Sequence, residues 1–76
     1  MNTWFIDITL KGSGVKLNCR YDGPEDNSSD VIVKIFDKKP PNEMLALRSD
    51  NNKHQIFIIA GEIAAIDIYQ QWRLIE

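Results

Sequence analysis

The stretch from residue 53 to residue 68 constrains the fold of this chain more than any other. It reads KHQIFIIAGEIAAIDI, is dense in β-branched and aromatic residues, and is interrupted once, at Gly61. This pattern predicts two strands that meet at a tight connection. The first, Gln55–Ala60, is expected to be buried on both faces, and the second runs from Glu62 to Ile68.

The segment after Gly61 has an alternative interpretation. A helix that begins near Glu62 would place Ile63, Ile66 and Tyr69 at partly helical spacing, but the β-branched content favours a strand. The tail from residue 69 to residue 76 either extends this strand or forms a short C-terminal helix.

The N-terminal third predicts a β-hairpin. Residues 4–11 alternate apolar and polar side chains, and residues 15–21 do the same. Between them, Gly12-Ser13-Gly14 supplies the positive backbone angles of a short hairpin loop.

The middle of the chain predicts two further strands. Residues 31–36 are apolar except for Lys34 and follow a polar loop, so we expect a third strand there. Consecutive prolines, Pro40 and Pro41, predict an exposed connection. Residues 43–48 are then expected to form a fourth strand, in a hairpin with Gln55–Ala60.

Together these patterns predict an all-β fold in one small domain, residues 1–76. We expect a barrel or sandwich of five to six mostly antiparallel strands, SH3-like or Sm-like in style, with a short C-terminal helix as an optional addition. The alternative is an α+β fold with a C-terminal helix on a sheet. Alternation predicts that the core contains Ile6, Ile8, Leu10, Val15, Leu17, Val33, Ile35, Ile56, Ile58 and Ile66.

Size and composition limit the class of protein. The chain has 76 residues, one cysteine and a formal net charge of −2, so it is neither a disulfide scaffold nor a strongly basic protein. No secretory leader and no apolar run long enough for a membrane span are evident in the sequence. We therefore expect a cytoplasmic protein with no membrane association.

Few residues suggest chemistry. His54 is the only histidine and lies beside a turn, so a surface position is favoured over a general acid or base. Cys19 falls on the apolar side of its strand, which favours a small buried side chain over a reactive thiol. The acidic loop between Asp22 and Asp30 lacks the spacing of a calcium loop. We expect no enzyme activity, no catalytic residues, no metal and no cofactor.

Aromatic residues are the better guide to function. Trp4 and Phe5 are adjacent on a strand and must face opposite ways. A small core has little room for two tryptophans, and exposed Trp and Tyr are enriched at interaction surfaces. The candidate interaction surface is therefore Trp4, Tyr69 and Trp72.

The segment IIAGEIAAI, residues 58–66, resembles the second signature of Sm-like proteins, in which two apolar strands flank a glycine. Ala60 stands where that signature has a basic residue, and one variable residue is missing before Ile63. The first signature, whose Asp and Asn recognise uridine, is not found. The resemblance implies a small barrel of bent strands and oligomers formed through strands, but not RNA binding.

These observations favour a non-catalytic protein-interaction or assembly module, of a size that suits a bacterial or prophage accessory protein. We expect a homo-oligomer, most simply a dimer, with Trp72 and the segment Tyr69–Ile75 at the contact. The alternative function is a small nucleic-acid-binding barrel that stacks bases on Trp4 or Trp72. Its scattered cations would be Lys16, Arg20, Lys34, Lys38, Lys39 and Arg48.

Overall fold

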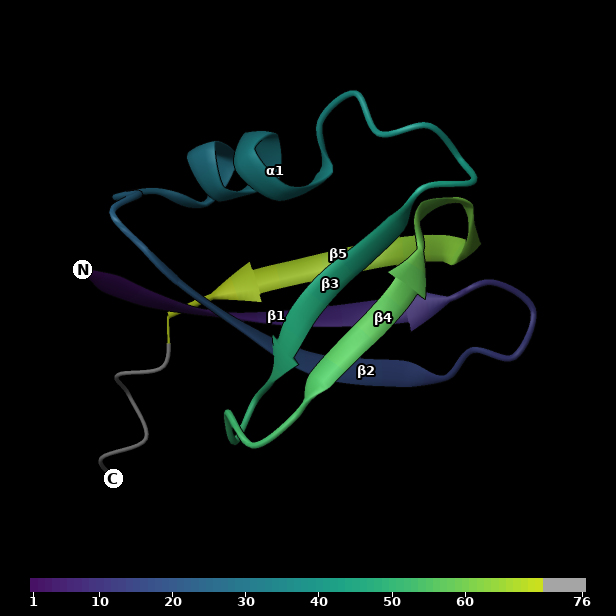
Figure 1. Cartoon of the computed structure of the whole chain (residues 1–76), viewed down its shortest axis with the longest axis horizontal. Coiled ribbons are helices and arrows are strands. Elements are labelled where there is room, and N and C mark those ends of the chain that lie inside the picture. Colours follow the sequence, from purple (N-terminus) through teal and green to yellow (C-terminus); the bar gives the residue numbers. More distant parts are fainter. Residues whose placement is uncertain (71–76) are drawn as a thin grey trace.

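A computed structural model describes residues 1–70, which form one antiparallel sheet and one helix (Figure 1). The elements in chain order are β1 (Asn2–Leu10), β2 (Lys16–Gly23), α1 (Ser28–Phe36), β3 (Met44–Ser49), β4 (Gln55–Ile59), a single 3₁₀ turn η1 (Ala60–Glu62) and β5 (Ile63–Tyr69). The spatial order of the strands is β4-β3-β2-β1-β5. The prediction of a mostly β fold with five antiparallel strands is confirmed.

The N-terminal hairpin is confirmed. β1 and β2 pair along nearly their whole length, and the amide of Leu10 donates to the carbonyl of Val15 at 2.9 Å. Gly12 and Gly14 have φ angles of 78° and 72° in the loop. Only glycine adopts such angles freely, so the two glycines fix this turn.

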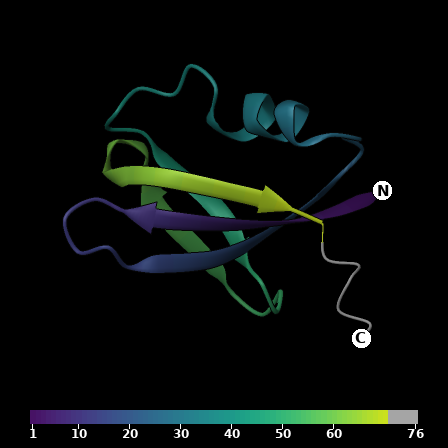
Figure 2. The same ribbon diagram turned by 180° about the vertical axis from the view of Figure 1, so that it is seen from behind.

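The sheet bends sharply between β2 and β3. These strands share only two residue pairs, Cys19 with Ser49 and Arg20 with Arg48. Figures 1 and 2 show β3 and β4 crossing the direction of β1, β2 and β5 at a wide angle. Among the described residues, β4 and β5 are not paired with each other, so the sheet has two open edges and does not close into a barrel.

The break at Gly61 is the 3₁₀ turn that carries the chain from β4 to β5. The amide of Gly61 donates to the carbonyl oxygen of Pro41 at 2.7 Å. A Cβ atom at this position would also lie 2.7 Å from that oxygen, so only glycine fits. The strand predicted after this glycine is confirmed as β5, whereas the tail from residue 71 onward lies outside the described residues.

The predicted third strand is wrong, because residues 31–36 belong to helix α1. Val31 and Ile35, one helical turn apart, face the core, and Phe36 packs beside them. The Asn27 side chain accepts a hydrogen bond from the amide of Asp30 at 3.0 Å and caps the helix. Asp30 in the first turn and Lys34 in the last complement the helix dipole. Figure 1 shows α1 lying over the sheet, outside the strand layer.

We expect Asn27→Ala to lower the free energy of unfolding by about 1 kcal/mol, because it removes the acceptor for the Asp30 amide. Urea titration followed by circular dichroism measures this loss. Asn42→Ala is the control, since Asn42 is exposed in a loop and caps no helix. Equal losses in the two variants would contradict the capping role.

The core lies between the bent sheet and α1. Its buried members are Trp4, Ile6, Ile8, Cys19, Val31, Leu47 and Ile58. The assignment of Val15 and Val33 to the core is wrong, because 49% and 60% of their surface is exposed. The first lies beside the hairpin loop, and the second lies on the outer side of α1. No helix within residues 1–70 has the length and apolar character to cross a membrane.

Candidate interaction surface

Trp4 belongs to the core rather than to an exposed surface. Only 6% of its surface is exposed, and its indole Nε1 donates to the Glu25 carbonyl at 3.2 Å. Because Trp4 shares its face of β1 with Ile6 and Ile8, the alternation of the strand carries it inward. The expectation that Trp4 contributes to an interaction surface is therefore corrected.

Tyr69 stands at the end of β5, opposite Phe5 on β1. The two rings stack with centroids 6.0 Å apart and planes inclined by 26°. Both side chains are half-buried. Trp72 lies outside the described residues. The structure therefore brings Tyr69 together with Phe5, and not with Trp4.

Cys19 is buried, as predicted. Burial raises the pKa of its thiol from the ordinary value of 9.0 to about 11, with smaller contributions from the negative charges of Asp7 and Asp50. A reactive thiol needs a lowered pKa. At neutral pH this sulfur is a protonated core group.

We expect Cys19 in the folded chain to react with a disulfide reagent at pH 8 at least about a hundredfold more slowly than in urea. The raised pKa alone reduces the thiolate by about that factor, and burial slows access further. The rate should rise with pH up to about 11 in the folded chain, but level off near 9.0 in the unfolded chain. Equal rates at pH 8 would show that the thiol is accessible.

His54 and the acidic residues between Asp22 and Asp30, the other candidates for chemistry, form no common site within residues 1–70. The side chain of His54 is exposed, as predicted, while its backbone amide donates to Ser49 Oγ at 3.2 Å. Asp22, predicted to lie in the acidic loop, belongs to β2 and pairs with Arg20, and the Glu25 carboxylate in the loop accepts a hydrogen bond from the Tyr21 hydroxyl. The hydrogen bond from Thr3, followed by the contact with Arg20, lowers the pKa of Asp22. Within residues 1–70, no group of His, Cys, Asp or Glu side chains is arranged to hold a metal ion.

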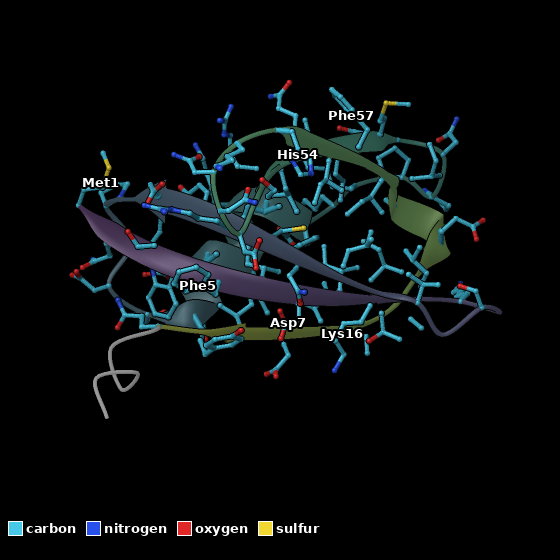
Figure 3. All side chains as sticks on the ribbon, turned by 90° about the horizontal axis from the view of Figure 1, so that it is seen from below. Met1, Phe5, Asp7, Lys16, His54 and Phe57 are labelled. Carbon is cyan, nitrogen blue, oxygen red and sulfur yellow. The ribbon has the colours of Figure 1, made fainter. Side chains whose placement is uncertain are left out.

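The most exposed apolar surface of the sheet lies on the outer side of β3 and β4. Met44 and Phe57 are each 59% exposed, and Ile59 is 37% exposed. Met44 lies opposite Ile59 across the two strands, and Ala46 lies opposite Phe57. These four side chains, which we call the β3–β4 apolar face, form one contiguous patch. Figure 3 shows Phe57 on the opposite side of the molecule from Asp7 and Lys16.

The outer edge of β4 carries unpaired backbone groups next to this face. The amide of Ser49 donates to the His54 carbonyl, and the amide of Ala60 donates to the Glu43 carbonyl. At both ends of β4, the backbone groups of His54 and Ala60 therefore point toward β3. By alternation, the amide and carbonyl groups of Gln55, Phe57 and Ile59 point away from it. In the part of the chain that the structure describes, no strand pairs with this edge.

Sequence reasoning missed this surface because it expected both faces of Gln55–Ala60 to be buried. In the structure, Ile56 and Ile58 face inward, whereas Phe57 and Ile59 face solvent. Strands buried on both faces are typical of sheets covered by helices on both sides, and here α1 is the only helix among the described residues. The uninterrupted apolar run of β4 was therefore a signal of an exposed apolar face.

Comparison of the chain with protein-family models, with curated proteins and with solved structures found no match.

Proposed function

We propose that this chain is a non-catalytic interaction or assembly module that binds a protein partner through the outer edge of β4 and the β3–β4 apolar face. The observation that carries the proposal is that an exposed aromatic side chain and an open strand edge occur at the same place. Phe57 is 59% exposed, and it lies on a strand with an open edge. An added strand would satisfy the open backbone groups and cover the apolar side chains at the same time.

The edge lacks the features that usually keep an exposed strand from pairing. Proteins protect such edges with charged residues, proline or bulges. Gln55–Ile59 contains no charged residue and no proline, and its register with β3 is continuous. An unprotected edge of this kind supports a role in binding.

Within residues 1–70, no observation favours the alternative function, binding of nucleic acid; Trp72, the second candidate for base stacking, lies outside the described residues. Trp4 is in the core and cannot stack on bases. Of the scattered cations, Arg20 pairs with Asp22 at 3.1 Å and Lys39 pairs with Glu43 at 3.6 Å. Nucleic-acid affinity depends on clustered free cations. Two of the six cations are therefore engaged by acidic side chains, which weakens the case for a nucleic-acid backbone.

We also propose that the fold is an open relative of the small barrels, since β5 returns to pair with β1 and the sheet bends between β2 and β3. In such an arrangement β4 is left at one edge, where a partner strand can extend the sheet.

Photo-crosslinking in cells that express this protein tests the proposed function. A photoreactive phenylalanine derivative at position 57 should form discrete, light-dependent protein adducts. The same residue at position 16 should not, because Lys16 is exposed on the other side of the molecule. The absence of adducts from position 57 would overturn the proposal.

A further inference from the structure

We infer that the partner strand at the β4 edge is β4 of a second copy of this chain, paired antiparallel about a twofold axis at Phe57. The inference rests on the proposed function and names its partner. The resulting dimer would extend the sheet continuously through both copies, in the order β3-β4 followed by β4-β3.

The backbone of β4 is suited to this register. The amide and carbonyl groups of Gln55, Phe57 and Ile59 all point toward the open edge, as the bonds on the other side of the strand require. In an antiparallel pair, a residue on the twofold axis faces its own copy. Phe57 would exchange two hydrogen bonds with Phe57 of the second copy, and Gln55 would pair with Ile59 at each end.

The side chains are also self-complementary. Phe57 of the two copies would lie side by side on the outer face, since directly opposed residues in a sheet point the same way. Met44 is 59% exposed and Ile59 is 37% exposed, and both lie on that face. The two apolar faces would merge into one patch, partly covered by the neighbouring copy.

Charge selects the antiparallel orientation over the parallel one. Lys53 and His54 precede β4, and Glu62 follows it in η1. Antiparallel pairing about Phe57 brings Lys53 of one copy near the turn that contains Glu62 of the other, at both ends of the contact. A parallel arrangement would place Lys53 beside Lys53 and Glu62 beside Glu62. Opposite charges at both ends therefore stabilise the twofold contact.

The test is charge substitution at the axis, measured by sedimentation equilibrium from about 5 µM to about 500 µM, the range required for a small interface. The unsubstituted chain should reach a dimer. Phe57→Glu and Phe57→Lys should each raise the dimer Kd by about 30-fold or more, since each places two like charges opposite one another. Val33→Glu is the matched control, because Val33 is 60% exposed on α1 and should leave the Kd unchanged.

The decisive experiment is to mix the two charge variants. Phe57→Glu and Phe57→Lys chains, each monomeric alone, should form a one-to-one dimer when mixed, because opposite charges then meet at the axis. If both variants dimerise as the unsubstituted chain does, the contact lies elsewhere and the inference is overturned. If the mixture stays monomeric, the two positions 57 do not face each other, which also overturns it.

The crosslinking experiment separates this inference from the proposed function. Adducts at position 57 with twice the mass of the chain support both. Adducts with a different protein only, together with a monomeric purified chain, support the proposed function and overturn the dimer. Larger assemblies that survive charge substitution at position 57 would show that the contact lies elsewhere on the chain, and would also overturn the twofold contact.

Discussion

Truncation of Ile58 to alanine will lower the free energy of unfolding by roughly 2–5 kcal/mol. Ile58 is 4% exposed and is the buried residue that β4 contributes to the core. It lies opposite Leu45, which is 5% exposed, so the cavity left behind would be lined by apolar atoms that cannot rehydrate. In a domain of this size, a loss at the upper end of the range leaves little folded protein.

The neighbouring residue supplies the control. Ile59 has the same side chain on the same strand, but it faces solvent with 37% of its surface exposed. Ile59→Ala should cost less than about 1 kcal/mol in dilute solution, as surface changes do. Urea titration of both variants measures the difference. Equal midpoints would show that β4 does not bury one face as the structure has it.

The strands were predictable where the local pattern admits only one interpretation. Alternation on both sides of Gly12 and Gly14 indicates a hairpin, and β1 and β2 pair as expected. The break at Gly61 likewise marks the end of β4, because the approach of the Pro41 carbonyl leaves no room for a side chain. In these segments side-chain periodicity and turn chemistry predict the same structure.

Helix α1 shows where local pattern is insufficient. Residues 31–36 are mostly β-branched or aromatic and suit a strand on propensity. The same residues place Val31 and Ile35 one helical turn apart, and the Asn27 cap begins the helix before them. Burial of one helical face outweighs the weak preference of β-branched residues for strands. Asn27, a favoured N-cap residue, was the signal in the sequence that a helix begins here. It stands among other polar residues that are equally typical of a loop.

The candidate site was less predictable than the fold, because exposure depends on which strand lies at an edge. The alternation of Ile56, Phe57, Ile58 and Ile59 does not reveal that one face of β4 remains uncovered. That outcome follows from the order β4-β3-β2-β1-β5, which is set by contacts between distant parts of the chain. The sequence did predict an aromatic interaction surface, but it assigned to it Trp4, which is buried.

Replacement of Trp4 by alanine should lower the free energy of unfolding by about 3–5 kcal/mol, which is typical for a buried tryptophan. The indole is 6% exposed and packs in the cluster that contains Ile6 and Val31, between β1 and α1. Its Nε1 also holds the carbonyl of Glu25, which accepts from the Asn2 side chain at 2.7 Å as well. The substitution would therefore open the core and weaken the loop that leads into α1.

Two variants separate these contributions. Trp4→Phe keeps an aromatic ring in the core but removes the donor to Glu25, so its loss should be smaller than that of Trp4→Ala. Phe5→Ala, on the opposite face of β1, removes a half-buried ring stacked on Tyr69 and should cost about 1 kcal/mol. Chemical denaturation gives all three values. A larger loss at Phe5 than at Trp4 would mean that β1 presents its other face to the core, contrary to the alternation that buries Trp4, Ile6 and Ile8.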